Sequence, residues 1–432
     1  MKNQIKSLSK YTLAAFLFLS TACNKEYLDP TRATDNVVLT SAKGLTGVAV
    51  GLQRVYTAGR TGVVYNSITA SGFVSNELVL LNPGNIPELQ LSSGGANIDG
   101  TNSVLNQLWT QNLKIIYDAD QVIANAANLN DKSYASGLIA YASIFKALAL
   151  GTLANHWENI PNEVGTNATF IPRIEGYTKA VAVLSAAQTA IAANAMSPAF
   201  LSSIPAGINI PNTLNALKAR YALFAGDYTL ALSSANAVDL SVKSVFNFDA
   251  VVLNPIFEIA TSTNNVFQPL NADLGLTDPL KPDPNDKRIP FYTTENTTIL
   301  PLIRINGFGA EGSTPIPVYL PGEMILIKAE AYARQPDLVN ALIELNKVVT
   351  KSPAQDPFGV GADLPPLVGP FTQQELLDQI YKQRSIELFM SGLRLEDMRR
   401  FNRPAADRKR SFFPYPFNER DNNTNTPADP AF

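Results

Sequence analysis

The side chains that most often carry out catalysis are scarce in this chain. Among its 432 residues, Cys23 is the only cysteine and His156 is the only histidine. Disulfides, cysteine-based zinc sites and metal sites with several histidines are therefore excluded within one chain. Ser–His–Asp catalysis would depend on His156 alone. The inventory argues against an enzyme, and we expect no cofactor and no bound metal.

The surroundings of Cys23 point to a different chemistry, the attachment of lipid. Three lysines and a short apolar run at residues 13–19 precede it, and the residues directly before it are small. This order is typical of a secretory signal peptide, and the run is shorter than the roughly 20 apolar residues that span a bilayer. Small residues followed by cysteine resemble a bacterial lipobox, in which the thiol receives a diacylglyceryl group and the chain is cut before it.

We therefore expect three parts in the chain. Residues 1–22 read as a lipoprotein signal peptide, residues 23–39 as a polar tether lipidated at Cys23, and residues 40–432 as a single domain. Acyl chains such as palmitate would anchor the protein stably where more than one is attached. Hydrophobic residues make up 46% of the chain, which suffices for a large core, and a net charge of −3 leaves no basic surplus to bind nucleic acid.

Long stretches of the domain show the spacing of helices. Apolar residues recur every three or four positions at 108–126, and an alanine-rich run follows at 134–156. In each of three tight turns, a small residue follows three places after the turn's large apolar residue: Gly176-Tyr177, Gly226-Asp227-Tyr228 and Pro336-Asp337-Leu338. A small residue there lets two antiparallel helices approach closely, as in tetratricopeptide repeats. We predict a mainly α-helical fold, a tetratricopeptide-like scaffold of helix pairs.

Segments of a different composition interrupt the helical pattern. Residues 73–104, 261–320, 351–371 and 402–432 are rich in Asn, Gly, Pro, Ser, Thr and Asp. Long loops in a compact domain are usually functional or disordered. We therefore predict large irregular excursions from the scaffold, above all at 73–104 and 261–320.

Three aspartates in the second excursion raise the question of calcium. Asp278, Asp283 and Asp286 could offer oxygen ligands, with prolines between them. Their spacing does not match an EF-hand, which needs acidic residues at alternate positions and a closing glutamate. A solvated acidic loop is the simpler interpretation.

The helical segment at 373–401 carries an arginine on an apolar face. Leu376, Ile380, Arg384 and Leu388 are each four residues apart, so Arg384 projects from an otherwise apolar stripe. A buried arginine is costly unless a carboxylate pairs with it. Gly392 follows the apolar run and suits a helix C-cap.

Several carboxylates near Arg384 could pair with it. Glu387, Glu396 and Asp397 are the candidates, while Arg394 with Asp397, and Glu396 with Arg400, have the spacing of helical ion pairs. We interpret Arg384, Glu387, Arg394 and Asp397 as a structural ion-pair network that locks two helices together. A ligand clamp is the alternative interpretation.

This segment also resembles the signature of the SusD/RagB family, the lipid-anchored nutrient-binding proteins of Bacteroidetes outer membranes. The family pattern R-R-I-E-L-x-x-E-G-x-R-x-x-D-L-R-R-W is matched by Arg384, Ile386, Glu387, Leu388, Gly392, Arg394, Asp397, Met398, Arg399, Arg400 and Phe401. Two residues depart from it, because Ser391 replaces a Glu and Phe401 replaces the Trp. Further pieces resemble family elements in the same order, at residues 109–123, 156–161, 286–288, 324–334 and 413–416.

The resemblance implies a binding protein and not an enzyme. Family members form a lid on a SusC-like TonB-dependent barrel, capture oligosaccharide or peptide outside the cell and release it into the barrel. The implied location is the outer membrane, lipid-anchored and facing the exterior. The implied partners are the transporter and the nutrient, with no nucleic acid.

A sugar site needs aromatic platforms, because one face of a pyranose stacks on rings while its hydroxyls require polar partners. In the family such platforms lie in loops that correspond to 73–104 and 261–320, whereas Trp109 and Trp157 lie elsewhere and suit core packing. The candidate ligand-binding residues in the two loops are Phe73, Asn76, Glu77, Asn82, Asn85, Phe291, Tyr292 and Phe308. For any one aromatic residue, covering the scaffold is the simpler role.

Two other classes of function stay open from the sequence. A lipid-anchored glycoside hydrolase would need two loop carboxylates across a cleft, about 5 or 6.5–9.5 Å apart, and no pair stands out. A tetratricopeptide-like scaffold with only protein partners would present a clean concave groove of helices and no loop pocket.

Overall fold

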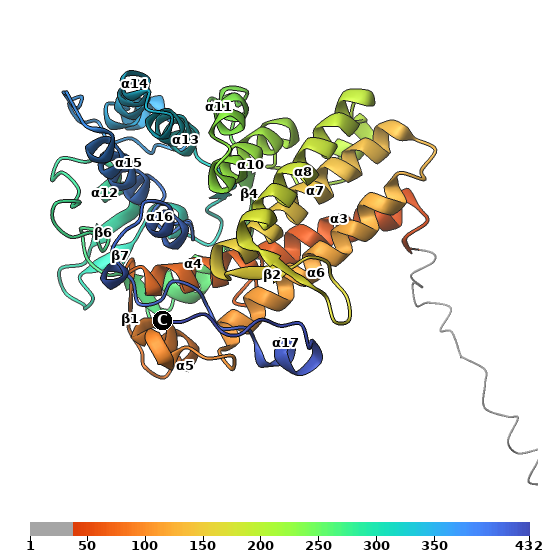
Figure 1. The fold of residues 1–432 in the computed structure, drawn as a ribbon, viewed down its shortest axis with the longest axis horizontal. Helices are drawn as coiled ribbons and strands as arrows, with labels where there is room; N and C mark the ends of the chain where they lie inside the picture. Colours follow the sequence, from red (N-terminus) through yellow and green to blue (C-terminus); the bar gives the residue numbers. More distant parts are fainter. Residues whose placement is uncertain (1–37) are drawn as a thin grey trace, which may run out of the picture.

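The computed structural model describes residues 38–432. The predicted signal peptide, Cys23 and almost all of the predicted tether lie outside the described residues. Figure 1 shows an array of long helices from α3 (Ala42–Thr57) and α6 (Ser103–Ala126) to α13 (Pro321–Arg334) and α14 (Leu338–Val349). Short strands, loops and the C-terminal segment pack along this array. The predicted mainly helical architecture is confirmed.

Each long helix of the array packs against its neighbours in the chain. Helix α6 contacts α7 (Lys132–His156), α7 contacts α8 (Arg173–Ala193), α8 contacts α10 (Ile210–Ala225), and α10 contacts α11 (Tyr228–Asn236). Helix α11 contacts α13, which packs on α14 and on α15 (Gln373–Glu387). This succession of neighbouring helices is the helix-pair scaffold that the sequence predicts.

Helix α7 forms the centre of the scaffold. It is long and apolar enough to cross a membrane, but 89% of its most apolar window is buried inside the protein, which makes it a core helix. Two glycines permit close packing: a Cβ atom would lie 2.1 Å from the ring of Phe200 at Gly137, and 2.1 Å from the ring of Tyr221 at Gly151. Side chains at these positions would force the neighbouring helices apart.

Two of the predicted turns between paired helices are confirmed. Gly226 ends α10 with a φ of +85°, a conformation that favours glycine. The carboxylate of Asp227 then caps α11 by accepting the amide of Leu230. Pro336 and Asp337 separate α13 from α14, and the carboxylate of Asp337 caps α14.

The predicted turn at Gly176-Tyr177 is wrong. Both residues lie inside α8, which follows directly on a hairpin of β2 (Asn159–Pro161) and β3 (Phe170–Pro172). Gly176 permits close packing and does not form a turn, because a Cβ there would lie 2.5 Å from the side chain of Ile160 in that hairpin. A glycine that permits close contact looks the same in sequence as one that permits a turn.

The excursions contain short elements of regular structure. Helix α4 (Val63–Val74) leads into the first excursion, which includes α5 (Ile86–Ser93) and η1 (Gly95–Asn97). Antiparallel strand pairs join distant segments: β1 (Leu78–Leu80) with β5 (Phe267–Pro269), β4 (Val245–Phe246) with β8 (Ile316–Pro317), and β6 (Thr293–Glu295) with β7 (Ile303–Ile305). The other short helices are α9 (Pro198–Leu201), η2 (Phe257–Thr261), α12 (Arg288–Tyr292), η3 (Gly307–Gly309), η4 (Pro353–Gln355), η5 (Ala405–Asp407) and α17 (Phe417–Asn422).

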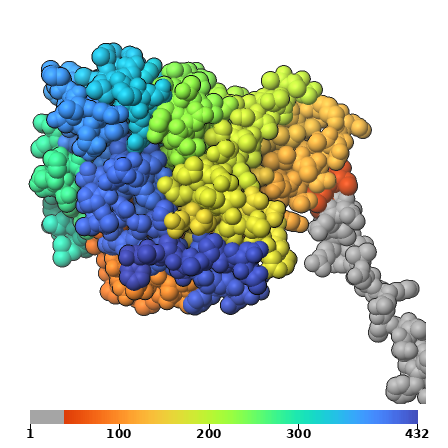
Figure 2. Space-filling model, in the orientation of Figure 1, coloured from red at the N-terminus to blue at the C-terminus, as the bar shows by residue number. Residues whose placement is uncertain are grey.

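The C-terminal segment returns to the N-terminal part of the domain. After α16 (Arg394–Arg400) the chain reaches α5 and η1, where Arg410 donates hydrogen bonds to the carbonyls of Gly95 and Ile98. Figure 2 shows these C-terminal residues in blue, beside orange residues from the early part of the chain. The tryptophans also lie in the core as expected, since Trp109 and Trp157 are buried with ring centroids 4.8 Å apart.

Candidate functional site

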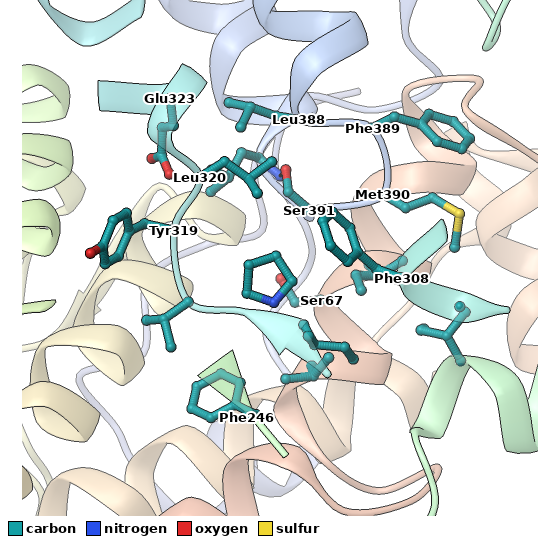
Figure 3. Close-up of a pocket in the computed structure, with 18 of the residues that line it drawn as sticks. Ser67, Phe246, Phe308, Tyr319, Leu320, Glu323, Leu388, Phe389, Met390 and Ser391 are labelled. Carbon is teal, nitrogen blue, oxygen red and sulfur yellow. Dashed lines mark hydrogen bonds between the residues drawn. The ribbon is translucent and has the colours of Figure 1, made fainter. Parts of the chain in front are cut away.

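A cleft of about 120 Å³ lies between the helical scaffold and the second excursion. Helices α3, α4, α7 and α10, the segment from η3 to the start of α13, and the link between α15 and α16 all contribute side chains to it. In Figure 3, Tyr319, Leu320 and Glu323 lie on one side of this cleft, and the link from Leu388 to Ser391 lies on another. We call it the central cleft.

The link between α15 and α16 is shaped by two residues with positive φ, Met390 at +56° and Gly392 at +79°. Gly392 packs on α4, because a Cβ there would lie 2.7 Å from Oγ of Ser67. The predicted helix C-cap at Gly392 is therefore wrong: α15 ends at Glu387 and its C-cap is Leu388. The glycine instead lets the link approach α4 and close one wall of the cleft.

A buried ion pair forms the floor of the central cleft. Arg220 in α10 donates from Nε to Oε1 of Glu323 at 2.6 Å, and from Nη2 to Oε2 at 2.7 Å. Burial disfavours the charge of Arg220, but the charge of Glu323 outweighs it and raises the pKa of Arg220 above its ordinary value. The two-point geometry is the strong form of such a pair. The floor is therefore polar, but both oxygens of Glu323 already accept hydrogen bonds from Arg220.

Tyrosines flank this ion pair. Burial raises the pKa of Tyr319 to about 12, and its hydroxyl accepts the amide of Asn212 at 3.1 Å. Burial also raises the pKa of Tyr56 above its ordinary value. Both phenols therefore stay neutral at physiological pH, and neither is suited to act as a base.

Aromatic rings line the opposite wall and reach the mouth of the cleft. Phe308 is half-buried and its ring centroid lies 6.1 Å from that of Tyr292 and 5.2 Å from that of Phe291. Tyr292 contacts Phe389 with centroids 5.7 Å apart. The edge-to-face packing of these rings holds Phe308 in place while part of it faces the cleft.

Polar side chains at the mouth of the cleft have more unused hydrogen-bonding capacity than the ion pair on its floor. Ser391 is exposed, and its hydroxyl accepts the amide of Leu393 at 3.3 Å, which leaves its proton available. Asn306 donates from Nδ2 to the carbonyl of Pro290 at 3.2 Å, so its side-chain oxygen can accept another hydrogen bond. The mouth thus combines an aromatic ring with donors and acceptors, the composition of a small-molecule site.

Close to the cleft, ion pairs tie the last two helices of the scaffold together. Arg384 is fully buried and donates to both carboxylate oxygens of Asp397, each at 3.0 Å. Of the predicted carboxylates, Asp397 is thus its hydrogen-bonded partner. Glu387 binds Arg288 and Lys351 instead, at 3.1 Å and 2.9 Å.

The two helical ion pairs predicted from spacing are not formed. Arg394 lies 3.3 Å from a carboxylate oxygen of Glu77, in the first excursion, and does not pair with Asp397. Glu396 binds Arg173 and Arg399 and does not pair with Arg400. In both cases packing brings an oppositely charged side chain from another element, Glu77 to Arg394 and Arg173 to Glu396.

Comparisons with known proteins agree with this arrangement. Residues 306–430 match the model of the SusD family, and this range contains the whole α15–α16 ion-pair segment. A SusD superfamily protein from Bacteroides thetaiotaomicron VPI-5482 is similar over 90% of this chain and 100% of its own, with a TM-score of 0.66 and 16% identity. The match over residues 306–430 thus confirms the predicted resemblance to the SusD family.

Other solved structures with this fold are similar to the chain. A SusD-like carbohydrate binding protein from Bacteroides vulgatus ATCC 8482 is 15% identical over 83% of both chains, with a TM-score of 0.65. Another protein of that description, from Bacteroides fragilis NCTC 9343, is 15% identical over 84% of this chain and 87% of its own, with a TM-score of 0.63. No curated protein sequence matches the chain. These structures establish the SusD-like fold beyond residues 306–430.

Only part of the predicted ligand-binding set lies at the central cleft. Tyr292 and Phe308 line it, and Phe291 supports both from behind. Phe73 is fully buried in α4 and contacts Phe267, with ring centroids 6.0 Å apart. Phe73 is therefore a core residue and not a loop platform.

None of the polar candidates of the first excursion lines the central cleft. Asn76 donates to the carbonyl of Asp407, while Glu77 is buried beside Arg394. Burial raises the pKa of Glu77 even though Arg394 favours its charge. Asn82 donates to Asn265, and Asn85 accepts from Arg60.

Sequence reasoning missed several residues of the central cleft. Arg220, Glu323, Phe389, Met390 and Ser391 line it and were not candidates. One of them could have been found from the sequence: Ser391 departs from the family pattern, and it lies at the mouth of the central cleft. The partnership of Arg220 with Glu323 left no such signal, because 102 other residues separate them in the chain.

The three aspartates considered for calcium have separate partners. Asp286 is buried and binds Arg288 at 2.7 Å, whereas Asp278 lies 3.3 Å from Lys281. Oδ1 of Asp283 accepts the amide of Asn285. Within residues 38–432, no group of three or more His, Cys, Asp or Glu side chains is arranged to hold a metal ion.

Proposed function

We propose that this chain is a lipid-anchored, outward-facing protein of the outer membrane that captures an oligosaccharide. It then delivers the ligand to a SusC-like TonB-dependent transporter. The observation that carries the binding role is the central cleft, where a half-buried aromatic ring and free polar groups meet at one mouth. The lipobox-like segment before Cys23 supports the anchor, and the similar carbohydrate binding proteins support the ligand class.

The mouth of the cleft suits one sugar unit of a longer chain. Phe308 offers a ring for the apolar face of a pyranose, and Ser391 and Asn306 offer hydrogen-bonding groups for its hydroxyls. A cavity of about 120 Å³ admits only part of an oligosaccharide, so the remaining units would lie outside the mouth. Peptide is the second ligand class, because its side chains could enter the same cavity.

The two competing classes of function receive less support. Glu323 is the acidic residue that lines the central cleft, and Arg220 occupies both of its oxygens, so a pair of catalytic carboxylates is not formed there. A pure protein-interaction scaffold would lack a loop-lined cleft. Here η3 and the segment before α13 form one wall.

The test is a glycan and peptide array probed with the purified protein, followed by calorimetry on each hit. We expect one glycan class to bind without turnover, and Phe308→Ala to weaken binding about tenfold through the lost stacking. Ser391→Trp should block the mouth, whereas Phe417→Ala, at an exposed ring outside the cleft, should leave binding unchanged. Unchanged affinity in both cleft variants would contradict this site, and hydrolysis of the glycan would contradict a pure binding role.

Delivery is tested separately from binding. The lipidated protein should co-purify from outer membranes with a TonB-dependent barrel after mild crosslinking. A protein that binds glycan but is never recovered with a barrel would refute the transporter partnership alone.

A further inference from the structure

A second cleft lies on the helical scaffold, apart from the central cleft. Its walls are the start of α8, the turn between α10 and α11, the end of α13, and α16 with the residue after its C-cap. These elements can be located in Figure 1. The cleft has a volume of about 350 Å³ and is lined by Arg334, Arg399 and Arg400. We call it the arginine cleft.

Positive charge is in excess beside this cleft. Ion pairs connect Arg334, Arg384 and Arg400 with Glu330 and Asp397. In a neighbouring group, Arg173 and Arg399 share Glu396. Five arginines therefore meet three carboxylates, which leaves two positive charges uncompensated. Buried charge without a partner is unfavourable, so this excess favours an anion in the adjoining space.

Donors that line the arginine cleft are also unused. Arg400 is buried, with 8% of its side chain exposed, and its Nε has no hydrogen-bond partner. Arg334 donates from Nε to Glu330 and from Nη2 to the carbonyl of Arg400, which leaves Nη1 without a partner among the described residues. Oxyanions are the ligands that several guanidinium donors recognise best.

The edge of the cleft adds neutral donors and an apolar wall. Tyr228 and Asn402 line it, and neither side chain has a hydrogen bond within residues 38–432. Phe224 and Ile174 line it as well. The guanidinium of Arg400 lies 4.6 Å from the ring centroid of Phe224, which holds it against that wall.

We propose that the arginine cleft binds a small ligand that bears a carboxylate or a sulfate group on an apolar-faced ring, such as an acidic sugar. The oxyanion accepts from Arg334 and Arg400, and Tyr228 and Asn402 bind polar groups at the edge. The volume lies at the lower end of the range for small-molecule sites. This site is independent of the central cleft and of whatever ligand binds there.

Calorimetry and thermal unfolding of the purified protein test the proposal at constant ionic strength. Sodium glucuronate, inorganic sulfate and neutral glucose are the probes. We expect saturable binding of glucuronate or sulfate with a matching rise in melting temperature, and no binding of glucose at this site. Binding of glucuronate alone identifies a carboxylate ligand, and binding of sulfate alone identifies a sulfated one. Binding of neither, or of glucose equally well, would overturn the proposal.

Variants localise the binding to the cleft. Arg334→Gln should weaken it at least tenfold. Tyr228→Phe and Asn402→Ala each remove one unused donor without breaking a bond in the fold, and each should weaken it severalfold. Arg420→Gln, at an arginine paired with Asp429 outside the cleft, is the matched control and should bind like the original protein. Full affinity in the three cleft variants would show that the anion binds elsewhere.

Discussion

Arg384 and Asp397 form a two-point hydrogen bond between α15 and α16, with Nε to Oδ2 and Nη2 to Oδ1 both at 3.0 Å. Their side chains are 0% and 2% exposed. Burial opposes the charge of Asp397, but Arg384 and Arg400 outweigh it and lower the pKa of this carboxyl. The pair fixes the two helices whose link forms one wall of the central cleft.

Replacing Arg384 should destabilise the protein strongly. Arg384→Ala leaves Asp397 buried without its two-point partner, and we expect the free energy of unfolding to fall by about 3–5 kcal/mol. Urea unfolding followed by circular dichroism measures the loss. Arg420→Ala removes a more exposed pair with Asp429 and should cost less than about 1 kcal/mol. Equal, small losses in both variants would show that the buried pair contributes little.

His156 should make stability depend on pH. It is fully buried, and burial lowers its pKa to about 4 from an ordinary value near 6.5. Between these values the unfolded chain binds a proton that the folded protein excludes, so stability falls as the pH decreases through this window. From pH 6.5 to 5 we expect a loss of about 2 kcal/mol.

His156 is the only histidine in the chain, which makes this effect assignable. The His156→Gln variant should be less stable at pH 7 but should lose most of its pH dependence between 6.5 and 5. Urea unfolding at several pH values measures both slopes. The same slope in the variant would mean that carboxylates cause the effect.

Two helical glycines should respond oppositely to alanine. Gly151→Ala in α7 places a Cβ 2.1 Å from the ring of Tyr221, and we expect a loss of about 1–3 kcal/mol from overpacking. Gly47 in α3 has nothing within 4 Å of that position, so Gly47→Ala should stabilise the helix by up to about 1 kcal/mol. Thermal unfolding of the pair checks the contrast. An unchanged melting temperature for Gly151→Ala would contradict the close packing at that position, and a loss of stability for Gly47→Ala would contradict the open space there.

Cys23 should control where the protein is found and not how it folds. Cys23→Ala removes the only thiol in the chain, and we expect a folded protein that is released from the membrane fraction. Fractionation with immunoblotting measures this, and circular dichroism of the released protein checks its fold. Retention of the variant in the outer membrane would contradict lipid anchoring at this residue.

The sequence predicted the helices because their signals are local. The apolar spacing at 108–126 corresponds to α6, and the capping residues Asp227 and Asp337 mark the starts of α11 and α14. The resemblance to the family could be read from the charged motif at 384–401, because its residues are contiguous in the chain. Gly176 was misread because one residue type serves both turns and close packing.

The candidate site was only partly predictable, because it depends on which segments meet. Phe308 was proposed and lines the central cleft, whereas Phe73 has the same residue type and lies in the core. The two rings differ in their exposure to solvent, which depends on how the surrounding segments pack against them. Ser391 became meaningful only when the turn at Gly392 brought it to the mouth.

By itself, then, the sequence determined the helical scaffold, the lipobox-like segment, the family motif and the scarcity of catalytic side chains. Each of these follows from residues that are close together in the chain. The tertiary structure alone decided the ion pairs between residues far apart in the chain. It pairs Arg394 with Glu77 and Arg220 with Glu323 across long stretches of chain, because a buried arginine takes the carboxylate that packing presents and not the one nearest in sequence.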